Sequence, residues 1–189
     1  MYLLPHRKWK TVVRTEGGDM EQEGAHGNTA VVEALAKAGK YLTFRLGAEE
    51  FGLAILKVQE IIGMLKITRV PRTPNFVRGV INLRGKVIPV IDLRLRFGME
   101  AHADTDRTCI IVVQIVLGTS RVTTGILVDD VCEVLNIVQE QLEPPPSLGT
   151  QVATDFLIGM GKVAQKVVML LDIDKVMAGA DLAGIEATH

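Results

Sequence analysis

The hydrophobic positions fall in short apolar runs that end at Gly, Pro or polar residues, a pattern typical of β-strands. The clearest runs are Val77–Leu83 and Val87–Leu95, and the tight Arg84-Gly85 turn between them predicts a β-hairpin. Gly79 interrupts the first run and predicts a bulge or a close backbone approach. Pro89 interrupts the second and predicts a bulge or a sheet edge. We expect a short, bent hairpin whose tip projects Arg84, either as a solvated turn residue or as a recognition residue.

The same pattern predicts strands along most of the remaining chain and few helices. A short helix is expected at Leu56–Ile62, a weak one at Asp174–Ala183, and another at Thr29–Ala38. Residues 139–155 contain three consecutive prolines and predict an extended loop. The further strands expected are Tyr41–Leu46, Phe51–Leu56, Ile67–Val70, Thr108–Leu117, Thr123–Val128, Val134–Val138, Phe156–Met160 and Val167–Ile173.

An internal repeat organises these elements. Residues 76–93 align without a gap on residues 156–173, and residues 52–60 align on 125–133. Two matches in the same order indicate a duplicated module of about five short strands. Because closure removes exposed strand edges, so small a module is expected to form a barrel. Arg84 aligns with Ala164, so whatever Arg84 does is not demanded by the barrel itself.

The repeat suggests how the chain is divided. Two small β-barrels lie side by side, and residues 1–40 precede them as an extension that we expect to be flexible. We place the first barrel and its connection at residues 41–107 and the second barrel at 108–177. Residues 178–189 form a tail or a weak helix.

Composition narrows the class of protein. Aromatic residues make up 4% of the 189 residues, so Val, Ile and Leu must build the core. No apolar run approaches the ~20 residues that span a bilayer. Basic residues follow the short apolar start, the reverse of a secretory signal, so we expect a cytoplasmic protein. Cys109 and Cys132 are isolated in apolar surroundings, which predicts two buried thiols instead of a disulfide or a metal pair.

The net charge of −1 hides an uneven distribution. Residues 66–96 carry eight Lys or Arg against one acid, whereas residues 122–160 carry six acids and no Lys or Arg. Such asymmetry concerns partners and orientation, and it predicts one face that seeks acidic surfaces and another that seeks basic ones.

Several motifs suggest catalysis or ligand binding, but the residues around each motif do not fit that function. Residues 159–164 fit G-x-G-x-x-A, but a strand pattern follows where a helix N-terminus should bind a pyrophosphate. Asp129-Asp130 and the Asp172/Asp174 pair lack a basic partner nearby in sequence, and we expect solvated turn acids. The basic stretch lacks aromatic residues for base stacking, which disfavours nucleic acid. A nucleotide-binding enzyme and a nucleic-acid-binding barrel remain as alternatives from other classes.

Four motifs run in order over nearly three-quarters of the chain. They are Leu56-Lys-Val-Gln-Glu-Ile61, Pro74-x-Phe-x-x-Gly-Val-x-Asn-Leu-Arg-Gly85, Val87-Ile-Pro-Val-Ile-Asp-Leu-Arg94 and Val128-Asp-x-Val-x-Glu-Val-Leu135. In these motifs, residues 41 to about 177 resemble the CheW-like adaptor family of bacterial chemotaxis. The resemblance implies an all-β fold of two SH3-like five-stranded β-barrels packed around a hydrophobic seam, with short helices.

The resemblance also implies a function. Members of the family are non-catalytic scaffolds without cofactors or metals. They couple the cytoplasmic tip of a methyl-accepting chemoreceptor to the regulatory domain of the chemotaxis histidine kinase CheA, in arrays at the membrane but without inserting into it. A chemosensory pathway with an output other than motility is the alternative within the family.

Site residues follow from the resemblance by motif. A receptor helix would lie in the groove between the barrels. The implied receptor-facing residues are Val58, Glu60, Ile61 and Arg84, to which we add Val131 as the second-copy partner of Val58. The implied kinase-facing residues are Ile67, Thr68 and Gly79. We expect Glu60 to orient Arg84 through an ion pair, and glycine at position 79 to let the edge of another barrel come close.

Overall fold

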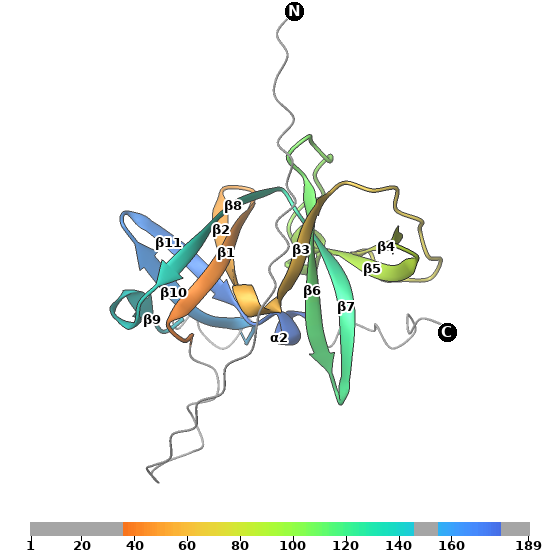
Figure 1. Cartoon of the computed structure of the whole chain (residues 1–189). Helices are drawn as coiled ribbons and strands as arrows, with labels where there is room; N and C mark the ends of the chain where they lie inside the picture. The colour runs from red at the N-terminus through yellow and green to blue at the C-terminus, as the bar shows by residue number, and fades with distance from the viewer. Residues whose placement is uncertain (1–35, 146–154, 179–189) are drawn as a thin grey trace, which may run out of the picture.

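The computed structural model describes residues 36–145 and 155–178 (Figure 1). Most of the predicted helix at Thr29–Ala38 lies outside these residues, and the described part, residues 36–38, is not helical. The strands are β1 (Gly39–Leu46), β2 (Glu49–Ala54), β3 (Val58–Gly63), β4 (Val77–Leu83), β5 (Lys86–Asp92), β6 (Cys109–Leu117), β7 (Ser120–Val128), β8 (Asp130–Ile137), β9 (Leu142–Glu143), β10 (Leu157–Val163) and β11 (Lys166–Leu171). The helices are α1 (Leu93–Arg96) and α2 (Ile173–Met177), with 3₁₀ turns η1 (Ile55–Lys57) and η2 (Gln139–Gln141). None of the described helices is long and apolar enough to cross a membrane.

The strands form two mixed sheets, and the expected all-β class of two small modules is confirmed. The six-stranded sheet has the order β8-β1-β2-β11-β10-β9, and the five-stranded sheet has the order β3-β6-β7-β5-β4. In Figure 1 the first lies on the left and the second on the right, with β3 and β8 near the junction. Two pairings join the copies of the repeat within each sheet. One is parallel, β2–β11 or β5–β7, and the other is antiparallel, β1–β8 or β3–β6.

The sheets do not follow the expected division at residue 107. The five-stranded sheet combines β3, β4 and β5 of the first copy with β6 and β7 of the second, and the six-stranded sheet combines β8–β11 with β1 and β2. Replacing each strand by its repeat equivalent converts β3-β6-β7-β5-β4 into β8-β1-β2-β11-β10. The two copies therefore exchange their first hairpins. Because both copies carry the same apolar pattern, the sequence does not distinguish a hairpin that pairs within its own copy from one that pairs across.

The repeat itself is visible in the local geometry. Both second hairpins carry a register shift at the same place, at Gly79 in β4 and at Gly159 in β10. The amides of Asp92 and Asp172 each donate to the carbonyl of the phenylalanine that precedes β4 or β10, at 2.8 Å. Both aspartates then cap the short helix that follows. Sequence equivalence at a spacing of 80 residues thus corresponds to structural equivalence.

Apolar residues fill three regions, in agreement with a seam between two modules. Adjacent residues of β6 point to different regions: Ile111 packs in the cluster shared by both sheets, and Ile110 packs in the cluster confined to the five-stranded sheet. This double burial explains the continuous apolar run that predicted β6. Four phenylalanines contributed by both copies, Phe44, Phe51, Phe97 and Phe156, stack in sequence with centroid separations of 5.9, 5.6 and 5.0 Å. The shared cluster is the hydrophobic seam.

Three local predictions are corrected. The helix expected at Leu56–Ile62 is wrong, because only η1 is helical there and the rest is β3, which pairs with β6. The strand expected at Ile67–Val70 is reduced to one bridge, between Thr68 and Val80. Pro89 lies in β5, an interior strand, but the ladder from β5 to β7 begins only at the next residue, so the missing amide donor costs no ladder hydrogen bond on that side.

Candidate functional site

The β4–β5 hairpin holds Arg84 at a strained turn. Leu83 and Lys86 form the last pair of the ladder, and the two residues between them have φ values of +53° for Arg84 and +86° for Gly85. Two central residues with positive φ are the signature of a type I′ turn, in which Asn-Gly is preferred over Arg-Gly. The Asn82 side chain accepts a hydrogen bond from the Gly85 amide at 2.8 Å and supports the turn.

The expected ion pair between Glu60 and Arg84 is confirmed. Nη1 of Arg84 lies 3.2 Å from Oε1 of Glu60, and Nη2 lies 2.7 Å from Oε2, so the guanidinium bridges both carboxylate oxygens. The Arg84 side chain is 73% exposed and that of Glu60 is 19% exposed. Glu60 on β3 therefore fixes the direction of a cation that remains open to a partner, while an exposed pair contributes only ~0–1 kcal/mol to the stability.

The apolar receptor candidates lie elsewhere. Val58, Ile61 and Val131 are half-buried and pack against the seam cluster. Neighbouring residues of a strand point to opposite faces, so Ile61 and Glu60 present different faces of β3. Val58 begins β3 and Val131 lies at the start of β8, which are edge strands of different sheets. The five predicted residues thus form two groups, a charged pair at the hairpin tip and three apolar residues at the seam.

The kinase candidates form one contiguous group. The backbone of Thr68 exchanges two hydrogen bonds with Val80 of β4, at 2.8 and 2.9 Å, and Ile67 packs on the core of the five-stranded sheet. A Cβ atom on Gly79 would lie 2.1 Å from the Thr68 carbonyl oxygen and 2.9 Å from a methyl group of Ile67, and Gly79 has a φ of +138°. A close approach thus occurs at Gly79, and within this chain the approaching segment is Ile67 and Thr68.

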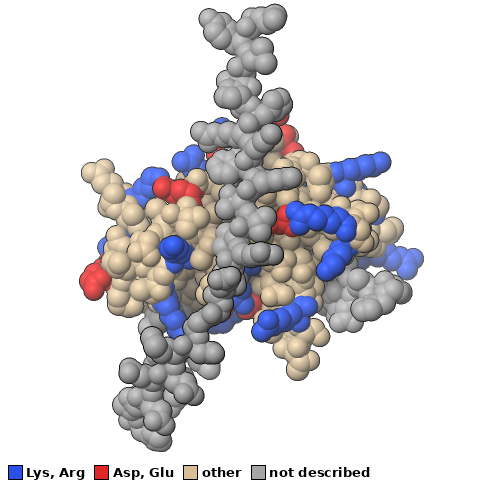
Figure 2. Space-filling model, viewed as in Figure 1, with Lys and Arg blue, Asp and Glu red and all other residues tan. Residues whose placement is uncertain are grey.

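The basic stretch divides into engaged and free side chains. Arg78, Arg84, Arg94 and Arg96 make ion pairs or hydrogen bonds. Among the described residues, none of the remaining four basic side chains makes an ion pair, and all four are exposed: Lys66, Arg69, Arg72 and Lys86. Several blue side chains protrude on the right of Figure 2, over the five-stranded sheet. The predicted basic face therefore belongs to the module that carries Arg84 and Thr68.

The expectation that the paired acids are solvated turn residues is wrong for Asp129, Asp172 and Asp174, which make structural contacts. Asp129 accepts hydrogen bonds from Nε of Arg94 at 2.8 and 3.0 Å and from the Gly47 amide at 2.7 Å. Burial alone would raise the pKa of Asp129, but these hydrogen bonds outweigh it and lower the pKa, and the same pair raises the pKa of Arg94. Asp174 pairs with Lys57, and Asp172 caps α2. The partners of Asp129 and Asp174 are distant in sequence, so the sequence did not indicate them.

The described residues give no support for a reactive cysteine, a metal site or a dinucleotide-binding site. Cys109 and Cys132 are free, half-buried thiols, and burial raises the pKa of Cys109 to about 12. Within the described residues no group of three or more His, Cys, Asp or Glu side chains gathers as a metal site. The G-x-G-x-x-A residues form β10 and a turn into β11, so no helix N-terminus follows them.

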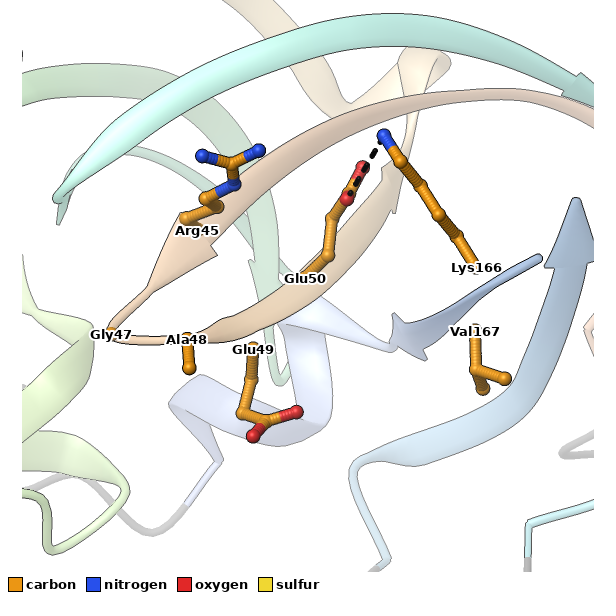
Figure 3. Close-up of a pocket in the computed structure, with 7 residues that line it drawn as sticks. All are labelled: Arg45, Gly47, Ala48, Glu49, Glu50, Lys166 and Val167. Atoms are coloured by element: carbon orange, nitrogen blue, oxygen red, sulfur yellow. Dashed lines mark ion pairs between the residues drawn. The ribbon is translucent and has the colours of Figure 1, made fainter. Parts of the chain in front are cut away.

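An open pocket of about 310 Å³, which the sequence reasoning missed, lies where the β1–β2 turn meets β11 (Figure 3). Glu50 points toward Lys166, with 3.6 Å between Oε2 and Nζ, and Arg45 faces Glu50 across the β1–β2 ladder. Oε1 of Glu50 is buried without a hydrogen-bond partner in the described chain. Because the pocket requires β11 to pair with β2 of the other copy, no local sequence signal marks it. Its charges are mixed and favour no particular ligand.

Comparison with known proteins identifies close relatives. The family model described as CheW-like domain matches residues 40–181. The chain is 39% identical over 147 residues to Chemotaxis protein CheW of Klebsiella aerogenes, covering 78% of this chain and 86% of that protein. It is 33% identical to Chemotaxis protein CheW of Helicobacter pylori, covering 73% and 81%. The crystal structure of scaffolding protein TtCheW from Thermoanaerobacter tengcongensis superposes with a TM-score of 0.66 at 37% identity, covering 74% of this chain and 92% of that one.

Proposed function

The chain belongs to the CheW-like family and is a coupling adaptor of chemotaxis, and from that premise we propose that it links the cytoplasmic tip of a methyl-accepting chemoreceptor to the histidine kinase CheA. The observation that carries the proposal is the exposed, fixed guanidinium of Arg84 at the tip of the β4–β5 hairpin. The equivalent turn carries Ala164 with nearly the same φ, +55°, so the fold does not need an arginine there.

The receptor surface uses both groups of residues described above. The planar guanidinium of Arg84, oriented by Glu60, binds a carboxylate or the carbonyl groups at a helix end in a fixed geometry that lysine does not reproduce. The half-buried Val58, Ile61 and Val131 supply apolar anchors along the seam, where a receptor helix lies between the two modules. The charged contact thus comes from the tip of the β4–β5 hairpin and Glu60 of β3, and the apolar contact comes from the seam side of β3 and from β8.

The kinase surface is the segment that covers β4. Thr68 is exposed and Ile67 is half-buried, while Gly79 lies beneath them and lets the segment approach. The regulatory domain of CheA binds this exposed edge. The role of Gly79 is therefore indirect, because it seats the segment that makes the contact.

The remaining parts of the proposal follow from the same role. The adaptor performs no chemistry and requires no cofactor or metal, and it works in the cytoplasm, where it joins membrane-bound receptor arrays only through its protein partners. It does not bind nucleic acid, because the basic side chains of the five-stranded sheet lack interleaved aromatic residues.

Calorimetric titration of the full chain with a receptor-tip fragment tests the receptor surface. Arg84→Glu removes the cation and repels Glu60, so binding should be lost while the melting temperature changes little. Lys86→Glu is the matched control, since it changes the charge equally on the same exposed hairpin tip and should retain most of the affinity. Receptor binding by Arg84→Glu at the original affinity would remove the basis of the proposal.

A second titration with the regulatory domain of CheA tests the kinase surface. Thr68→Lys keeps both backbone hydrogen bonds to Val80 and places a long side chain on the exposed face, so kinase binding should weaken and receptor binding should persist. Thr119→Lys, in the exposed β6–β7 turn, is the control. If Thr68→Lys and Thr119→Lys bind the kinase domain equally well, this surface is assigned incorrectly.

A further inference from the structure

Two short crossovers connect the sheets, and each leads into an edge strand. Between β2 and β3 the chain passes through η1 from the six-stranded to the five-stranded sheet, and between β7 and β8 it returns at Asp129. Val58 follows the first crossover directly, and Val131 lies just after the second. The positions of these two apolar residues relative to one another therefore depend on how the crossovers are held.

The second crossover is held by a three-way contact. Asp129 pairs with Arg94 of α1, which follows the five-stranded sheet, and accepts the amide of Gly47 in the β1–β2 turn of the six-stranded sheet. The Asp129 amide in turn donates to the carbonyl of Arg45 at 3.1 Å. The side chains of Arg94 and Asp129 are 15% and 30% exposed, so solvent screens this pair less than a surface pair.

The first crossover is held in the same way by residues of opposite charge. Lys57 pairs with Asp174 of α2, which follows the six-stranded sheet. Asp174 also accepts the amide of Val116 in β6 of the five-stranded sheet, at 2.9 Å. Both clusters thus join the helix and the first hairpin of one copy to the crossover of the other.

The repeat makes the correspondence explicit. Arg94 and Asp174 are equivalent residues, 80 positions apart, and both act on a crossover. The polarity is reversed, because the helix supplies the cation in one cluster and the carboxylate in the other. If Arg94 and Asp174 exchanged places, Arg94 would meet Lys57 and Asp174 would meet Asp129, and both contacts would bring like charges together. The charges therefore favour the observed arrangement over the one in which the two copies exchange these positions.

We propose that the Arg94–Asp129 and Lys57–Asp174 pairs are positioning residues that fix the two edge strands relative to one another, so that Val58 and Val131 meet one receptor helix together. The effect on receptor binding rests on the proposed function, whereas the claim that the pairs hold the two edge strands in place does not. Each pair acts through the crossover that it holds, and neither pair is required to touch the receptor. The kinase surface at Thr68 lies within one sheet and does not depend on either pair.

The test measures geometry and binding separately. In a chain with Cys109→Ala and Cys132→Ala, spin labels at the exposed positions 121 of β7 and 136 of β8 report the distance between the sheets. Lys57→Met and Arg94→Met should each broaden the distance distribution. Both should weaken binding of the receptor-tip fragment by roughly three- to thirtyfold, and leave binding of the kinase domain unchanged.

Three comparisons keep the inference open to refutation. Lys57→Arg should restore the narrow distribution and the affinity, whereas general destabilisation of the fold would weaken receptor and kinase binding alike. Lys162→Met, which removes an exposed pair with Glu143 inside one sheet, should change neither measurement. An unaltered distance distribution in Lys57→Met and Arg94→Met overturns the inference, as does unaltered receptor affinity. If the unmodified chain fails to bind the receptor fragment, the proposed function fails, while the distances still decide whether the pairs hold the sheets.

Discussion

Replacing Arg84 with asparagine should separate the stability of the fold from receptor binding. Arg84 has a φ of +53°, and a left-handed backbone costs about 1–2 kcal/mol for an ordinary L-residue. Asparagine tolerates this conformation, and Asn-Gly is the preferred pair of a type I′ turn. The substitution also removes the ion pair with Glu60, which at 73% exposure of the arginine is worth about 0–1 kcal/mol. We expect the free energy of unfolding to stay equal or to rise by up to about 1 kcal/mol.

Receptor binding should change in the other direction. A hydrogen bond to a charged group is worth about 1.5–3 kcal/mol when its partner is left unsatisfied, so losing the guanidinium should weaken receptor binding about 10- to 100-fold. Urea unfolding gives the stability and calorimetric titration gives the affinity. A variant that is clearly less stable would show that the ion pair holds the hairpin, and one that binds normally would show that the tip does not contact the receptor.

Two controls isolate the terms. Ala164→Gly relieves a φ of +55° at the equivalent turn without changing any charge, so it reports the backbone effect alone. A double-mutant cycle with Glu60→Gln measures the interaction between Arg84 and Glu60 directly. We expect a coupling below about 1 kcal/mol in the free chain.

Three further outcomes follow from other parts of the structure. Gly79→Ala should destabilise the fold by about 3 kcal/mol or more, because its Cβ would lie 2.1 Å from the Thr68 carbonyl oxygen. Gly85→Ala has no atom within 4 Å of the added Cβ and should cost only about 1 kcal/mol. Thermal unfolding of the two variants compares these losses of stability. The pKa of Asp129 is lowered in the fold, so its contribution is complete above the ordinary carboxyl pKa of about 4 and is lost as the pH falls through the lowered value. Urea midpoints across acid pH should therefore fall less steeply for Asp129→Asn. Cys109, with a pKa of about 12, should react with iodoacetamide at pH 8 far more slowly in the native chain than in urea.

Local patterns predicted what is decided locally. The β4–β5 hairpin, its glycine bulge and the counterpart of Arg84 in the second copy followed from apolar runs and from an ungapped repeat. The pairing of Glu60 with Arg84 was expected from the family resemblance and not from spacing, because 24 residues separate them. These features need only a strand pattern and a turn, which short stretches of sequence specify.

Features that depend on which strands pair were not predictable. The segment Leu56–Ile62 has apolar residues at spacings that fit a helix, and pairing of β3 with β6 overrode that preference. Gly79 indicated a close approach but not its partner, since the Thr68 carbonyl arrives from a loop of irregular structure. The partners of Asp129 and Asp174 become neighbours only after the copies exchange hairpins, which no single stretch encodes.

The exchange of hairpins also explains how one duplicated chain presents two unequal surfaces. Each sheet contains strands of both copies, so neither copy of the repeat forms a complete sheet by itself. The seam between the sheets is therefore a shared core and not a contact between two separately folded domains. Selection can then vary exposed turns without disturbing that core, as the contrast of Arg84 with Ala164 at equivalent positions illustrates. An adaptor needs this combination, because two partners must be held at a fixed separation by a body that does not itself rearrange. The buried repeat supplies such a fixed body, and differences between its copies, such as Arg84 against Ala164, supply the distinct surfaces that we propose for the two partners.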